Sequence, residues 1–112
     1  MIKVHLETVH DVVIVKINGR IDAHSSKTLT ENLEIVYEEY KSHHVIIDMK
    51  EVEYISSSGL GIIVSLKRSL ELRNKEMKLC GITPAVKKVF KVLGMEKSFD
   101  IYASVNKALD SF

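Results

Sequence analysis

Three consecutive serines, Ser56, Ser57 and Ser58, lie between a predicted strand and an apolar segment that begins Gly59-Leu60. A serine at the start of a helix commonly caps it, because the hydroxyl accepts a hydrogen bond from a free backbone N–H. The start of a helix also carries about half a positive charge, which favours an anion such as a phosphate made on serine. One hydroxyl is enough for a cap. The residues alone therefore leave two interpretations open for this segment, a helix cap and a phosphorylation site.

Other reactive motifs are missing from the serine segment. A nucleophile elbow needs Gly-x-Ser-x-Gly and a phosphate-binding P-loop needs Gly-x4-Gly-Lys-Ser/Thr, and neither pattern occurs there. None of the five histidines stands three or four residues from a second one, which is the helical spacing expected of a metal site. We therefore expect no catalytic residues, no metal and no cofactor.

Two aspartates are further candidates for a site. Asp22 follows a predicted strand and precedes a predicted helix, so local chemistry favours an Asx turn or a helix cap. Asp48 stands near the end of the apolar run Val45–Met49, where a carboxylate would accept bonds from loop amides. Both aspartates are expected at the loop edge of the sheet, near the serines.

The pattern of apolar residues predicts the elements that hold these side chains. Residues 2–7 alternate in polarity and residues 12–19 are rich in β-branched side chains, which predicts an opening hairpin joined at His10-Asp11. Further strands are expected at 44–49, 77–82 and 99–104. Four helices are expected, one after Ser25-Ser26, one deeply buried in its first half after Ser57-Ser58, one between Thr83 and Gly94, and one after Ser104 with Phe112 facing inward.

This order predicts an α/β fold in which a mixed sheet, opened by an antiparallel hairpin, is packed against about four helices. The 112 residues show no change of composition, so we expect one domain over residues 1–112. No apolar run approaches a membrane span and the start lacks the pattern of a signal peptide, which predicts a soluble cytoplasmic protein. Cys80 is the single cysteine and is expected to be a buried thiol.

Charge is distributed unevenly along the chain. Residues 1–56 carry 6 Lys and Arg against 10 Asp and Glu, whereas residues 57–112 carry 10 against 5. The basic residues are spread out and lack interleaved aromatics, which disfavours nucleic-acid binding. The asymmetry could orient a protein partner.

Four segments together resemble the anti-sigma factor antagonists, the stand-alone bacterial STAS domains. These are Gly19-Arg20-Ile21-Asp22, the strand Val45–Met49, Ile55-Ser56-Ser57-Ser58-Gly59-Leu60-Gly61, and the run from Leu79 to Met95 that reads LCGITPAVKKVFKVLGM. The resemblance covers essentially the whole chain. It implies a single STAS domain that, when unphosphorylated, binds an anti-sigma factor that is also a serine kinase. Phosphorylation would release that partner, and a PP2C-type phosphatase would reset the switch.

The resemblance also assigns roles to residues. Ser57 matches the family's phosphoacceptor, with Ser56 and Ser58 as weaker candidates, and Ser58 is then expected to be the helix cap. The partner-binding surface would include Asp22, Ser56, Ser57, Ser58 and Gly59. This chain has Ser56 where the family most often has aspartate. We expect a monomer or weak dimer.

Two alternatives remain open at this point. The first, motivated by the serine at position 56, is a STAS subunit of a transporter-associated or signalling scaffold that no kinase switches. The second is an enzyme or small-ligand protein that uses Asp22, Asp48 and the serines as one cluster.

Overall fold

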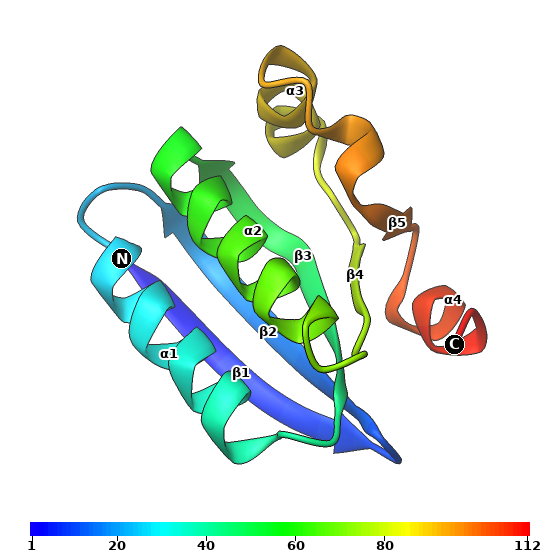
Figure 1. Cartoon of the computed structure of the whole chain (residues 1–112). Helices are drawn as coiled ribbons and strands as arrows, with labels where there is room; N and C mark the ends of the chain where they lie inside the picture. Colours follow the sequence, from blue (N-terminus) through cyan, green and yellow to red (C-terminus); the bar gives the residue numbers. More distant parts are fainter.

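A five-stranded mixed sheet in the order β1-β2-β3-β4-β5 forms the centre of the molecule, as Figure 1 shows. The computed structural model describes all residues from 1 to 112. The strands are β1 (Ile2–Val9), β2 (Val12–Ile21), β3 (His44–Ile55), β4 (Met77–Cys80) and β5 (Asp100–Tyr102). β1 pairs antiparallel with β2, and the other neighbours pair in parallel. The predicted opening hairpin and mixed sheet are thus confirmed.

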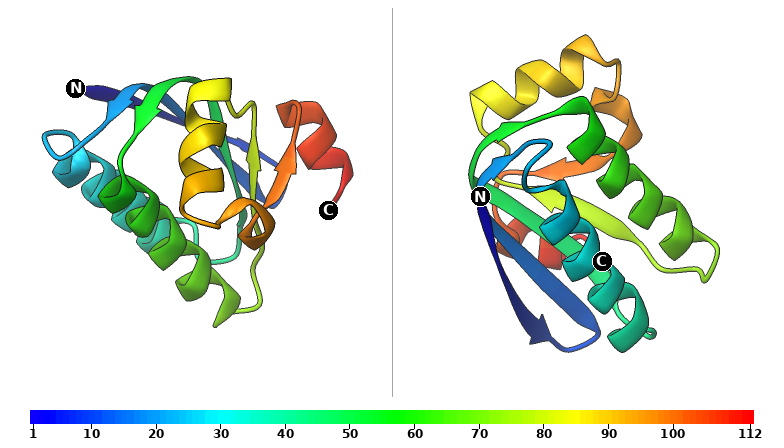
Figure 2. Two further views of the ribbon diagram at one scale, coloured as in Figure 1. Left: turned by 90° about the horizontal axis from the view of Figure 1, so that it is seen from above. Right: turned by 90° about the vertical axis from the view of Figure 1, so that its left-hand side faces the viewer.

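Helices lie on both faces of this sheet (Figure 2). They are α1 (Ser26–Glu39), α2 (Ser57–Glu71), α3 (Pro84–Val92) and α4 (Val105–Asp110), with a short 3-10 helix η1 (Glu96–Ser98) before β5. α1 and α2 lie side by side on one face, and α4 packs on the other against β3, β4 and β5. α3 lies at the end of the sheet where α2 begins.

β2 and β3 bury side chains on both faces, because successive residues of a strand point to opposite sides. Val13, Val15 and Ile47 belong to the main core beneath α1 and α2, whereas Ile14 and Ile46 belong to a smaller core beneath α4. The continuous apolar runs of the sequence therefore mark strands covered from two sides.

β3 is longer than the sequence predicted. It continues past Met49 to Ile55, and its second half pairs only with β2, where Val52 and Ile55 are buried and the residues around them are exposed and mostly charged. The end of β3 nearest the serines therefore lies six residues beyond the predicted one. The predicted strand at 77–82 is shorter in the structure, since β4 ends at Cys80.

The predicted ends of α3 are confirmed. The Thr83 hydroxyl accepts a bond from the Val86 amide, Pro84 is the first helical residue, and Gly94 has a φ of +66° just after the helix. The predicted deep burial of the first half of α2 is only partly correct. Ile63 is fully buried, but Ile62 and Val64 are half-buried, since α2 lies on the outside of the sheet with α1 along one flank.

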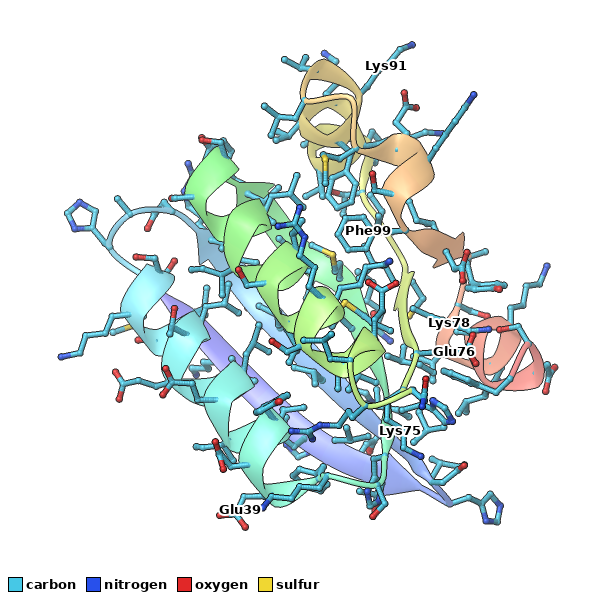
Figure 3. All side chains as sticks on the ribbon, in the orientation of Figure 1. Glu39, Lys75, Glu76, Lys78, Lys91 and Phe99 are labelled. Atoms are coloured by element: carbon cyan, nitrogen blue, oxygen red, sulfur yellow. The ribbon has the colours of Figure 1, made fainter.

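Two side chains labelled in Figure 3, Phe99 and Lys78, make contacts within the C-terminal third of the chain. Phe99 packs on Phe90 of α3 with 5.6 Å between ring centroids. Lys78 of β4 is buried, and its Nζ donates to the backbone oxygen of Ser111 at 3.1 Å and to its Oγ at 2.7 Å. Phe112 is 39% exposed, so its predicted inward position is only partly correct.

Candidate functional site

The serine segment forms the start of α2. Ser56 is the N-cap, with extended backbone at φ −84° and ψ 165°, and its Oγ accepts a hydrogen bond from the Gly59 amide at 3.0 Å. The expectation that Ser58 caps the helix is therefore wrong. A cap must precede the helix with extended backbone, and Ser58 is already in the first turn, where its Oγ lies 3.0 Å from that of Ser56.

Ser57 differs from both neighbours because its hydroxyl makes no hydrogen bond within the chain. It is the first helical residue of α2 and is exposed. The sequence left a helix cap and a phosphorylation site as alternatives for this segment, and the structure places the cap on Ser56. Ser56 has the structural role, and Ser57 presents a free hydroxyl at the positive end of a helix.

Close packing holds the serine segment against the end of β2. The Ser56 amide donates to the Ile21 carbonyl at 2.8 Å. Gly59 is buried, and a Cβ added there would collide with the Ile21 side chain. Because Gly59 is covered, any part it has in binding is to let α2 approach β2 and so fix the serines.

The residue after Ile21 is Asp22, which forms the predicted Asx turn. Its Oδ1 accepts bonds from the His24 amide at 3.0 Å and the Ser25 amide at 3.1 Å. These bonds, led by the one from Ser25, hold the pKa of the Asp22 carboxyl below its usual value. The structure thus confirms that Asp22 lies at the same sheet edge as the serines.

Ser25 stabilises this turn rather than capping α1 with its side chain. It occupies the N-cap position without a side-chain cap bond. Its buried Oγ instead donates to the Arg20 carbonyl at 2.6 Å and accepts from the Asp22 amide at 2.9 Å. Its hydroxyl therefore ties the Asp22 turn back to β2.

Asp48 does not belong to this site, and the prediction that it does is wrong. It lies inside β3, opposite Lys16 of β2 and Cys80 of β4, and is only 3% exposed. Its Oδ1 accepts from the Lys50 amide at 3.1 Å, and the Lys50 Nζ lies 4.0 Å from its Oδ2. The extra length of β3 separates it from the serines, so the three-part cluster of the enzyme alternative is not assembled.

Cys80, the neighbour of Asp48 in the sheet, is the buried free thiol that the sequence predicted. Burial, and then the negative charge of Asp48, raises the pKa of the thiol to about 12. Cys80 is therefore a packing residue rather than a nucleophile.

A shallow groove of about 220 Å³ begins at Ser57 and runs along α3. Its lining consists of Tyr54, Ile55, Ser57, Lys88, Val89, Val92 and Leu93. The Arg20 guanidinium lies 4.8 Å from the centroid of the Tyr54 ring. Val92 is 84% exposed and, with Tyr54 and Leu93, gives this groove an exposed apolar lining.

The sequence did not predict that side chains of α3 line this groove together with Ser57. One signal was available, since Val92 falls outside the buried stripe of Val86 and Phe90 and so had to face solvent. What no local pattern could show is that α3 packs on β3 at the same end of the sheet as the start of α2 (Figure 2).

Two further features concern the whole chain. No group of three or more His, Cys, Asp or Glu side chains is placed to hold a metal ion. None of the helices is both long enough and apolar enough to cross a membrane.

Residues 3–108 match the family model of the STAS domain. The chain belongs to the STAS domain family. This STAS domain is 32% identical to the anti-sigma-B factor antagonist of Listeria monocytogenes over 81% of this chain and 79% of that protein. It is 25% identical to the anti-sigma F factor antagonist of Paenibacillus polymyxa over 96% of this chain and 92% of that protein. The resemblance inferred from the four segments is confirmed.

The fold of this STAS domain is shared with solved structures. An anti-sigma factor antagonist from Mycobacterium paratuberculosis superposes with a TM-score of 0.90 at 23% identity, covering 99% of this chain and 93% of that one. This likeness confirms the predicted α/β STAS fold with its mixed sheet and packed helices.

Proposed function

We propose that this STAS domain is an anti-sigma factor antagonist that binds an anti-sigma factor when Ser57 is unmodified and releases it when Ser57 is phosphorylated. The names of the relatives from Listeria and Paenibacillus support the antagonist function. The phosphorylation switch rests on one observation, the free and exposed hydroxyl of Ser57 beside two serines that bond to each other.

The kinase in this proposal is the anti-sigma factor itself, and a PP2C-type phosphatase removes the phosphate. A kinase must bring the acceptor oxygen in line with ATP, which requires an accessible hydroxyl. Ser57 meets this condition without loss of any hydrogen bond, whereas modifying Ser56 would remove the cap on Gly59.

The fold tolerates a phosphate on Ser57. The group adds roughly −1.5 to −2 charges, which the unpaired amides and positive end of α2 accommodate. Ser57 is exposed and makes no hydrogen bond that a phosphate would break, so the backbone of the free domain should stay the same. The effect then falls on the complex, where a surface fitted to a neutral hydroxyl meets a bulky charged group.

Asp22 completes the proposed partner surface. Its carboxylate lies at the sheet edge next to the serine segment, and its Oδ2 makes no hydrogen bond within the chain. An arginine or lysine of the anti-sigma factor could pair with that oxygen while Ser57 is docked. Ser58 lies beside Ser57 on the same exposed turn, and Gly59 fixes the turn from below.

The test is a phosphorylation assay with the anti-sigma factor purified from the same organism. With ATP, the wild-type domain should gain one phosphate, Ser57→Ala should gain none, and Ser58→Ala should still be modified. Phosphate on Ser57→Ala would refute the acceptor assignment. Native co-purification with a membrane transport complex, and with no kinase, would instead support the scaffold alternative.

A further inference from the structure

Lys88 of α3 reaches the same groove as the candidate phosphoacceptor, although the two residues are far apart in sequence. Ser57 begins α2 and Lys88 lies in the middle of α3, and both line the groove of about 220 Å³. The start of α2 and α3 lie at the same end of the sheet, as Figures 1 and 2 show.

The ammonium group of Lys88 is unpaired in the unmodified protein. None of the four ion pairs of the structure includes it, and it donates no hydrogen bond. α3 itself carries Lys87, Lys88 and Lys91 and no acidic residue. The other cation near this groove, Arg20, lies over the Tyr54 ring. A free cation therefore lines the same groove as the hydroxyl that the proposed function would convert into a dianion.

We propose that Lys88 is the counter-ion of phosphorylated Ser57 and that the ion pair ties the start of α2 to α3 across the groove. The inference rests on the proposed function for the identity of the modified residue. Charge-assisted bonds between an ammonium and a phosphate oxygen are short and stronger than neutral ones. The flexible four-carbon stem of lysine lets the ammonium move to the phosphate without movement of the helix.

This pair gives phosphorylation a second effect on the partner surface. Tyr54, Val92 and Leu93 supply exposed apolar area around the groove. A Lys88 side chain drawn across to Ser57 lays its apolar stem over that area and places a charge pair at its edge. The phosphate would thus cover the apolar contact region as well as repel the anti-sigma factor.

The test uses the full chain with phosphoserine inserted at position 57 by an expanded genetic code, and measures the phosphate pKa by 31P NMR. In the wild type, Lys88 favours the dianion and lowers the second pKa from its ordinary value of about 6. Lys88→Gln should raise that pKa by about half a pH unit at low salt, as expected for an exposed pair. Lys88→Arg should retain the low pKa.

Lys87→Gln is the matched control, since it removes the same charge from the same helix. Lys87 is exposed and lines a different groove, on the β5 side of α3. An equal pKa change in Lys87→Gln and Lys88→Gln, or no change in either, would overturn the inference. A second readout is the amide spectrum, in which Lys88 and Val92 should shift on phosphorylation only when Lys88 is present.

Neither readout uses a kinase or an anti-sigma factor. A failed kinase assay would therefore refute the proposed function without affecting the measured pair. Conversely, an unchanged phosphate pKa would refute the pair and leave the proposed switch at Ser57 intact.

Discussion

The Oγ of Ser56 accepts a hydrogen bond from the Gly59 amide at 3.0 Å, so the first of three serines caps α2 and the second is left free. Because of this bond, Ser56 serves as the helix cap and the Ser57 hydroxyl stays free. Serine is among the preferred N-cap residues, so Ser56 can satisfy the Gly59 amide without help from its neighbours.

Removing the cap should destabilise the domain. Ser56→Ala loses the bond to Gly59 and should lower the free energy of unfolding by about 1 kcal/mol. Ser57→Ala loses no bond and should change it by less than about 0.5 kcal/mol. Urea unfolding followed by circular dichroism measures both. Equal losses in the two variants would contradict the assignment of the cap.

The two glycines of α2 should respond in opposite directions to alanine. At Gly59 a methyl group collides with Ile21, so Gly59→Ala should cost about 1–3 kcal/mol. At Gly61 no atom beyond the adjoining residues and the helix's own backbone lies within 4 Å of the added Cβ, so Gly61→Ala should stabilise the helix by about 0.5–1 kcal/mol. Thermal unfolding of both variants checks this. A neutral Gly59→Ala would mean that α2 does not pack on β2 as described.

The Asp22 turn should make the free energy of unfolding depend on pH in the acidic range. Its pKa is lowered from 3.8 in the folded protein, so the ionised carboxylate favours folding above that pH. This contribution is lost as the pH falls through the lower folded value. Asp22→Asn keeps an acceptor oxygen but no charge, so it should have a lower Tm than wild type at pH 7, with the gap closing below about pH 4.

A control for that series is Asp100→Asn. Asp100 is exposed and makes no side-chain hydrogen bond or ion pair, so its replacement should leave the Tm nearly unchanged at both pH values. A constant gap for Asp22→Asn from pH 7 to pH 3 would show that its charge does not support the turn.

Cys80 should resist thiol reagents in the folded protein. Alkylation needs the thiolate, and burial raises the pKa of this thiol to about 12. Iodoacetamide at pH 8 should therefore label the native domain hardly at all and the urea-unfolded chain completely, as read by mass spectrometry. Rapid labelling of the native domain would contradict the buried position beneath α4.

Local signals predicted the parts of the fold that local chemistry determines. Thr83, Pro84 and Gly94 marked the ends of α3 correctly, because capping and backbone restrictions act within a few residues. The exact cap of α2 was missed, since Ser56 and Ser58 have the same chemistry and only the backbone conformation distinguishes them.

Features that depend on packing between distant segments could not be predicted. The second half of β3 is half-exposed and pairs with one neighbour, so its sequence lacks the apolar run that marks a strand buried on both sides. Because β3 continues to Ile55, Asp48 lies inside the strand and away from the serines. The place of Lys88 beside Ser57 depends on how α3 packs against the end of the sheet, which no short pattern encodes.

The central claim is that a phosphate on Ser57 breaks the complex with the anti-sigma factor. Isothermal titration calorimetry should compare the unmodified domain with domains carrying encoded phosphoserine at position 57 or, as a control, at the exposed Ser65 in the middle of α2. We expect phosphate at position 57 to weaken binding at least about a hundredfold, or about 2.8 kcal/mol, and phosphate at position 65 to weaken it far less. Equal affinity of the unmodified and Ser57-phosphorylated domains would contradict it.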